Sequence, residues 1–151
     1  MNHTKAIDVL LVEDSEEDVN LMIETLKVSD FTINLRVAQD GEEAMLYLKD
    51  LQRQMPDLVI LDLNMPRKNG REVLLEMKKD PRLKVIPVVI LTTSRSKEDI
   101  SYCYQNYSNC YICKPLDFDN YFDVIREIER FWLKTVSLPN EHDEIGGFPR
   151  G

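Results

Sequence analysis

Polar residues that could do chemistry follow four separate hydrophobic segments of this chain. They are the pair Glu13 and Asp14, then Asp62, Thr92 and Lys114. Carboxylate oxygens are the ligands that Mg²⁺ prefers in proteins. An ammonium and a hydroxyl can hold the oxygens of a phosphoryl group during transfer. The residue types therefore predict a site for a divalent cation and a phosphoryl group.

The three acids have distinct expected roles. Carboxylates that converge repel one another, so either their pKa values rise or a cation neutralises them. We expect Mg²⁺ here, with Glu13 and Asp14 as ligands directly or through water and Asp62 as a direct ligand. The backbone carbonyl of Asn64 is the expected fourth protein contact.

Asp62 has a second expected role, as a nucleophile. Between the metal and the Lys114 ammonium, one carboxylate oxygen can attack phosphorus and form an aspartyl phosphate. The Thr92 hydroxyl would then donate to a phosphoryl oxygen. Taken singly, each residue has an ordinary alternative: Asp14 could cap a helix, Lys114 could be a surface lysine, and Thr92 could be a typical strand residue. Their ordered placement at four segment ends favours the functional interpretation.

Strand-like and helix-like segments alternate along the chain and would position these residues. A helix is expected after Ser15, and others after Asp40, Gly70 and Ser96. The expected buried face of the second helix consists of Ala44, Leu48 and Leu51. That of the last helix consists of Phe118, Tyr121, Phe122, Ile125, Ile128 and Trp132.

Five strand–helix pairs predict a doubly wound α/β fold. Parallel strands need crossover connections and bury both faces, so helices should cover both sides of a five-stranded parallel sheet. Ligands bind such sheets beyond the carboxyl ends of the strands, where all the candidate residues fall. We expect one domain over residues 1–136 and a polar, flexible tail over 137–151.

Composition excludes several classes of partner. The formal net charge of −8 argues against a nucleic-acid-binding or anionic-membrane surface. No signal segment or membrane-spanning run is present, so we expect a soluble, cytoplasmic protein. Cys110 and Cys113 form a CxxC pattern, which raises a redox or zinc alternative. Their expected strand would put them on opposite faces, which favours ordinary half-buried thiols.

From Ile7 to about Trp132, the chain resembles the receiver domains of two-component response regulators. The matching motifs are Glu13-Asp14, Asp62 with Met65-Pro66 and Gly70, Thr92 with Thr93-Ser94, and Lys114-Pro115. The resemblance implies a flavodoxin-like sheet of order 2-1-3-4-5 with five helices, and phosphorylation of Asp62 by a sensor histidine kinase. It also implies a cis Lys114–Pro115 bond. It pairs Thr92 with Tyr111 as a switch that remodels the surface of the fourth helix, fifth strand and last helix.

A narrower resemblance is to the small stand-alone regulators of cyanobacterial phytochrome kinases. It involves residues 114–122, 131–133 and 138–139. It implies a phytochrome histidine kinase as phosphoryl donor and a homodimer through the surface just described. Five aromatic residues also support a dimer unless they pack internally; they are Tyr102, Tyr104, Tyr107, Phe131 and Trp132. With no DNA-binding module expected after residue 136, output would pass through protein contacts.

Two other classes of function share part of this pattern. A haloacid-dehalogenase-like phosphatase also uses a strand-end aspartate with Mg²⁺, but it needs a second aspartate two positions on, where this chain has Asn64. A flavodoxin-like FMN carrier would share the fold. Its phosphate loop would follow the first strand, where Glu13 and Asp14 would repel the FMN phosphate.

Overall fold

A computed structural model describes residues 6–139 of the chain and contains one parallel sheet of five strands. The strand order is β2-β1-β3-β4-β5. The strands are β1 (Ile7–Val12), β2 (Ile33–Ala38), β3 (Leu58–Leu61), β4 (Val88–Thr92) and β5 (Cys110–Cys113). This confirms the doubly wound sheet of order 2-1-3-4-5.

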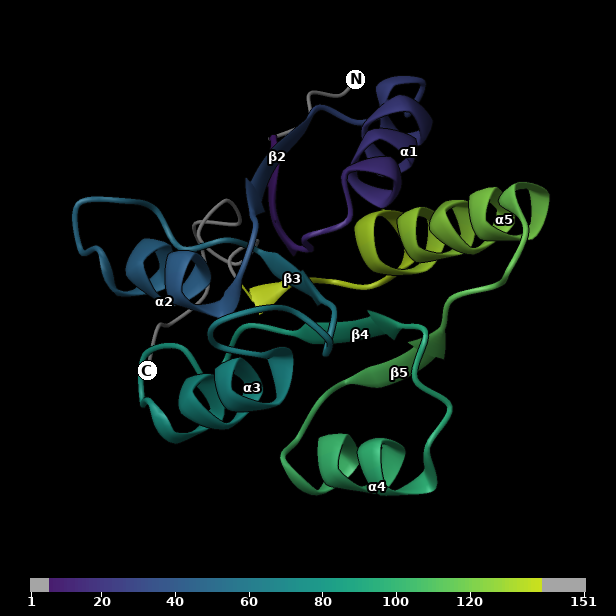
Figure 1. The fold of residues 1–151 in the computed structure, drawn as a ribbon. Helices are drawn as coiled ribbons and strands as arrows, with labels where there is room; N and C mark the ends of the chain where they lie inside the picture. Colours follow the sequence, from purple (N-terminus) through teal and green to yellow (C-terminus); the bar gives the residue numbers. More distant parts are fainter. Residues whose placement is uncertain (1–5, 140–151) are drawn as a thin grey trace.

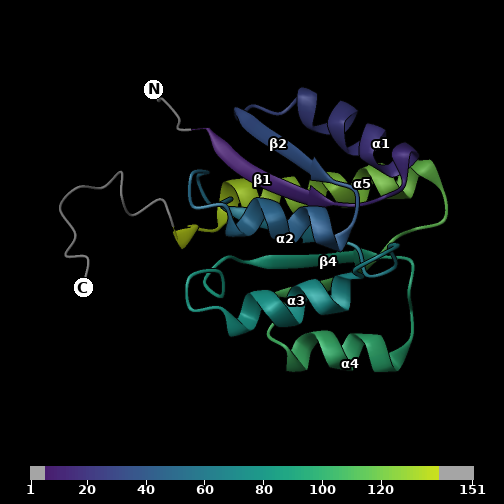
Figure 2. The same cartoon turned by 60° about the vertical axis from the view of Figure 1, so that its left-hand side comes forward.

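The helices cover both faces of the sheet. They are α1 (Glu16–Lys27), α2 (Gly41–Lys49), α3 (Gly70–Lys79), α4 (Lys97–Gln105) and α5 (Phe118–Ile128). Figures 1 and 2 show α1 and α5 on one face and α2, α3 and α4 on the other. A π-helical segment, η1 (Glu129–Thr135), continues directly from α5, where the sequence predicted a single regular helix.

Each α-helix begins after a polar residue whose side chain accepts a hydrogen bond from the backbone N–H three positions on. These pairs are Ser15 with Asp18, Asp40 with Glu43, Asn69 with Glu72, Ser96 with Asp99, and Asp117 with Asn120. Such caps satisfy donors that the first turn leaves unpaired. Ser15 therefore caps α1, and the alternative role of Asp14 as its cap is wrong.

The sheet divides the core into two clusters. Successive strand side chains point to opposite faces, so Leu10 and Val12 pack toward α2, α3 and α4, whereas Val9 and Leu11 pack toward α1 and α5. Each fully buried aliphatic side chain stabilises the fold by about 1.5–3 kcal/mol. A register slip of one residue would reverse these faces, so core packing also fixes where Asp62 leaves the sheet.

Three expected core residues are exposed. Leu51 lies beyond the end of α2 and is 77% exposed, because that helix stops at Lys49. Phe118 and Phe122 are 65% and 39% exposed. They are four positions apart, so they share one side of α5, while its buried contacts come from Tyr121, Ile125 and Ile128 on another side.

The Lys114–Pro115 bond is trans, so the implied cis bond is wrong. Leu138, assigned by sequence to the tail, is buried in the second cluster; residues 140–151 lie outside the described residues.

Tyr102 and Trp132 pack partly against the core. The other three aromatics considered for a dimer are at least half exposed: Tyr104, Tyr107 and Phe131. Over residues 6–139, no helix combines the length and apolarity that crossing a membrane requires.

Candidate functional site

Backbone hydrogen bonds continue past the strand ends and hold the candidate residues beside one another. The Asp62 N–H donates to the Val12 carbonyl at 3.0 Å, next to Glu13. The Lys114 N–H donates to the Thr92 carbonyl at 2.7 Å. The polar residues that follow β1, β3, β4 and β5 thus meet at one edge of the sheet.

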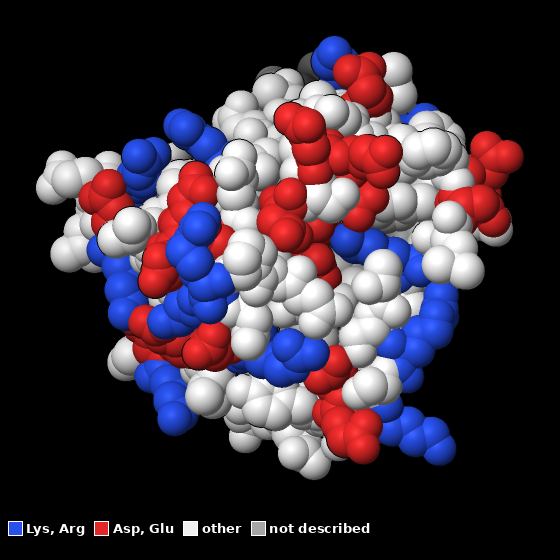
Figure 3. Space-filling model, viewed as in Figure 1, with Lys and Arg blue, Asp and Glu red and all other residues white. Residues whose placement is uncertain are grey.

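Glu13, Asp14 and Asp62 form a carboxylate cluster at this edge. One oxygen from each lies within 4.8 Å of the others. Glu13 and Asp62 are buried, whereas Asp14 is exposed. Figure 3 shows acidic side chains gathered near the middle of this face, where β1 leads into α1. Three converging oxygen donors, one of them open to solvent, suit a hard divalent cation that keeps some of its waters.

Glu13 is held in an unfavourable electrostatic position. Burial, with repulsion from Asp62, raises the pKa of Glu13 from its ordinary 4.5 to about 7, despite contacts with Lys114 and the Ser15 N–H that lower it. A cation among these carboxylates would favour the charged form of Glu13.

Lys114 is buried among three carboxylates. Its Nζ lies 2.7 Å from Glu13 Oε1, 2.7 Å from Asp18 Oδ2 and 3.7 Å from Asp62 Oδ2. Burial lowers the pKa of Lys114, but the hydrogen bonds to Asp18 and Glu13 and the nearby charges outweigh it, so the net pKa is raised. Lys114 therefore stays cationic. Sequence reasoning missed Asp18, which it read as an acid in the first turn of a helix.

The loop after β3 orients Asp62. Its Oδ1 accepts hydrogen bonds from the N–H of Leu63 at 2.7 Å and of Asn64 at 3.4 Å. Gly70 starts α3 against the backbone here, and a Cβ at this position would overlap the Asp62 carbonyl oxygen. Only glycine allows this approach without a shift of the loop.

Asn64 lies at the rim of the site. It lines a shallow, open pocket together with Asp14 and Arg71. Asn64 thus lies beside Asp14, the exposed member of the carboxylate cluster.

Thr92 and Tyr111 are joined through Ser94. The buried Thr92 Oγ1 accepts from the Ser94 N–H at 3.4 Å, and the Tyr111 hydroxyl donates to the Ser94 carbonyl at 2.9 Å. The Tyr111 ring packs partly against the first core cluster. Burial raises the pKa of Tyr111, so its hydroxyl remains a hydrogen-bond donor. Ser94 entered the sequence reasoning only as part of the Thr92 motif.

An ion pair joins α3 to α4 beside this loop. Arg71 donates from Nε and Nη2 to the two carboxylate oxygens of Asp99, both at 2.7 Å. The Ser94 hydroxyl donates to the same carboxylate at 2.6 Å. Arg71 also reaches Asn64 Oδ1 at 3.4 Å. These contacts connect the loop after β3 with the loop after β4.

The two β5 cysteines are free and face opposite sides of the sheet. Cys110 packs in the second core cluster, while Cys113 Sγ lies 3.6 Å from the Ser94 carbonyl. This agrees with the expectation of ordinary thiols in a strand.

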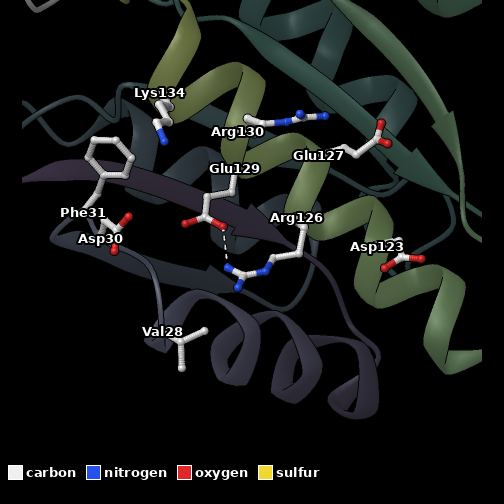
Figure 4. A pocket seen from close by; sticks show the side chains of 9 residues that line it. All are labelled: Val28, Asp30, Phe31, Asp123, Arg126, Glu127, Glu129, Arg130 and Lys134. Carbon is white, nitrogen blue, oxygen red and sulfur yellow. Dashed lines mark hydrogen bonds and ion pairs between the residues drawn. The ribbon is translucent and has the colours of Figure 1, made fainter.

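A groove of about 510 Å³ lies away from the carboxylate cluster, between the end of α1 and the last helical segments (Figure 4). Figure 4 shows Arg126 and Glu129 paired within it, at 2.9 Å. None of the candidate site residues lines it.

The sheet order and the residues at its carboxyl edge define a receiver domain, and comparison with known proteins agrees. Residues 9–126 match the response regulator receiver domain family. The chain belongs to this family, as its resemblance implied. This assignment favours a signalling receiver over the phosphatase and flavin-carrier alternatives.

Among known proteins, the chain is 44% identical over 135 residues to response regulator Rcp1 of Synechocystis sp., covering 87% of this chain and 92% of that protein. The crystal structure of the Mn²⁺-bound form of Rcp1 has a TM-score of 0.86 and covers 88% of this chain and 99% of that one. The phosphorylated cyanobacterial phytochrome response regulator RcpA is 43% identical, with a TM-score of 0.86 and coverage of 89% and 99%. The narrower resemblance to cyanobacterial phytochrome response regulators is confirmed.

Proposed function

We propose that this receiver domain accepts a phosphoryl group on Asp62 from a phosphohistidine of a sensor histidine kinase. The observation that carries the proposal is the position of Asp62. Its buried carboxylate follows β3, within the carboxylate cluster and 3.7 Å from the Lys114 ammonium. The phosphorylated state of the similar RcpA supports the same chemistry.

Asp62 Oδ2 is the proposed attacking oxygen, because Oδ1 accepts hydrogen bonds from the following loop. A bond forms between this oxygen and phosphorus, the phosphorus–nitrogen bond breaks, and the imidazole nitrogen keeps the electron pair. Lys114 would contact an equatorial phosphoryl oxygen, and the Thr92 hydroxyl would donate to another.

Mg²⁺ is the proposed cofactor, and the donor set fits it. Glu13, Asp14 and Asp62 would hold it through carboxylate oxygens, with the Asn64 carbonyl as a further ligand. When bound, Mg²⁺ neutralises charge on the phosphoryl oxygens. The Mn²⁺-bound form of the similar Rcp1 supports a divalent cation as the cofactor.

The proposed output is a change of protein contacts. Thr92 would move toward the phosphoryl group, and Tyr111 would follow and remodel the surface of α4, β5 and α5. Exposed aromatic side chains on or just after α4, Tyr104 and Tyr107, support a homodimer through this surface. The likeness to RcpA supports a phytochrome kinase as the phosphoryl donor. Three free cysteines suit a reducing cytoplasm.

Intact-mass measurement tests the acceptor. Wild type treated with acetyl phosphate and Mg²⁺ should gain one acid-labile phosphoryl unit, and Asp62→Asn should gain none. Asp117→Asn is the matched control, because asparagine keeps the α5 cap, and it should label normally. A label that persists in Asp62→Asn would identify a different acceptor.

Phosphotransfer profiling tests the donor. Purified histidine kinases, phytochromes among them, would be phosphorylated with labelled ATP and mixed with the chain for short times. We expect the fastest transfer from a phytochrome kinase. Faster transfer from a kinase of another class would contradict that part of the proposal.

A further inference from the structure

Asp18 contacts Lys114 although it is not one of the clustered carboxylates. Its Oδ2 lies 2.7 Å from Lys114 Nζ, as close as Glu13 Oε1. Its side chain is 22% exposed, whereas that of Glu13 is 3% exposed. Asp18 thus offers the ammonium a second strong partner at the mouth of the site.

Ser15 orients both of these partners. Its N–H donates to Glu13 Oε2 at 3.1 Å, which leaves Glu13 Oε1 for Lys114. Its hydroxyl caps α1 by accepting from the Asp18 N–H at 3.3 Å. The start of α1 therefore places Asp18 and Glu13 together at the Lys114 ammonium.

Helix capping alone does not account for the placement of Asp18. Acids in the first turn stabilise a helix through its dipole, and Glu16 and Glu17 supply the same charge. Of these three acids, Asp18 is the one whose carboxylate forms an ion pair with Lys114 in the described chain.

Of the three carboxylates around Lys114, two are also proposed to bind the cation and one is not. Glu13 and Asp62 are also proposed cation ligands, so a bound cation competes with the ammonium for both. Asp18 lies outside the carboxylate cluster and stays available. An unpaired buried charge is costly. Without Asp18, the Lys114 ammonium would therefore have only Glu13 and Asp62 as partners among these three carboxylates, and these are the two that the cation also needs.

We propose that Asp18 is a positioning residue that holds the Lys114 ammonium while Glu13 and Asp62 engage the divalent cation. This inference rests on the proposed function and adds that Asp18 controls how tightly the site binds the divalent cation. Asp18 keeps the Lys114 ammonium near Asp62 but prevents it from forming a close ion pair with the Asp62 carboxylate. The site is then ready for both the cation and the phosphoryl group.

Mg²⁺ binding to the unphosphorylated protein gives the first test. Calorimetric titration with MgCl₂ would compare wild type with Asp18→Asn, Asp18→Glu and Glu17→Gln. Glu17→Gln removes the same charge from the same turn without touching Lys114. We expect Asp18→Asn to weaken Mg²⁺ binding about tenfold, the scale of one charge-assisted hydrogen bond. Asp18→Glu should restore most of the affinity, and Glu17→Gln should change it far less.

The Mg²⁺ dependence of labelling by acetyl phosphate gives the second test. In Asp18→Asn, the half-saturating Mg²⁺ concentration should rise by the same factor, whereas in Glu17→Gln it should stay near the wild-type value. A merely structural defect would not be rescued by Asp18→Glu, which restores the carboxylate opposite Lys114.

Two results would overturn the inference. One is equal weakening of Mg²⁺ binding by Asp18→Asn and Glu17→Gln. That result would mean that the loss of one negative charge, and not the contact with Lys114, weakens binding. The other is an unchanged half-saturating Mg²⁺ concentration in Asp18→Asn. Both leave phosphorylation of Asp62 in wild type intact, whereas loss of that labelling would refute the proposed function itself.

Discussion

Replacing Glu13 with glutamine should stabilise the metal-free protein at alkaline pH. Glutamine is neutral, as the protonated acid is, and its one side-chain oxygen can keep the hydrogen bond from Lys114, whereas the hydrogen bond from the Ser15 N–H to the second oxygen is lost at every pH. It removes the buried negative charge that burial and Asp62 disfavour. The gain should therefore depend on pH.

The size of the effect follows from the pKa of Glu13. Below its unfolded value near 4.5, Glu13 is protonated in both states. As the pH rises from there to about 7, the unfolded chain loses the proton first, so wild type loses stability. Above this window the full loss remains, about 3 kcal/mol. This corresponds to roughly 6–12 °C in melting temperature. The pKa already includes the favourable effect of Lys114.

Urea unfolding in EDTA measures this difference. The stability of Glu13→Gln relative to wild type should rise by about 3 kcal/mol between about pH 4 and about pH 8. Glu17→Gln, which changes an acid in the first turn of α1, controls for net charge. A gap between Glu13→Gln and wild type that is the same at both pH values would refute the electrostatic reasoning.

Three other perturbations probe neighbouring features. Mg²⁺ at tenfold excess over its Kd should stabilise wild type by about 1.4 kcal/mol in thermal unfolding; an equal rise in Asp62→Ala would count against the metal assignment. Gly70→Ala should cost more than about 2 kcal/mol in urea unfolding, because its methyl group would overlap the Asp62 carbonyl. Burial raises the pKa of the Cys103 thiol to about 11, so iodoacetamide should modify native Cys103 more slowly than Cys113. Mass mapping that finds the reverse order would contradict this.

The sequence predicted most of the fold because polar residues mark the ends of β1, β3, β4 and β5. Asp62 follows four hydrophobic residues that are buried on both faces of the sheet. The helix caps at Ser15, Asp40 and Ser96 were equally visible, since a cap depends on residues three positions apart. Local patterns therefore gave the element order and the edge where the site lies.

Contacts between distant elements were harder to predict. Asp18 and Lys114 are 96 positions apart, and their contact depends on how α1 is rotated over the sheet. The exposure of Phe118 and Phe122 has the same origin, because spacing alone does not say which side of α5 meets the core. The π-helical turn that begins at Glu129 likewise has no marker in the hydrophobic spacing.

The ion pair between Arg71 and Asp99 has a mechanical consequence for α4. Asp99 is bonded to α3 through Arg71 and to the loop after β4 through Ser94. When Ser94 is displaced, Asp99 loses either its hydrogen bond with Ser94 or its ion pair with Arg71, and α4 moves with the loop in the second case. A bidentate guanidinium–carboxylate contact adds geometric specificity as well as energy, so it holds α4 in one orientation relative to α3. We expect α4 to keep its position during small displacements of the loop, while the contact between Arg71 and Asp99 holds. Larger displacements should break that contact and allow α4 to move.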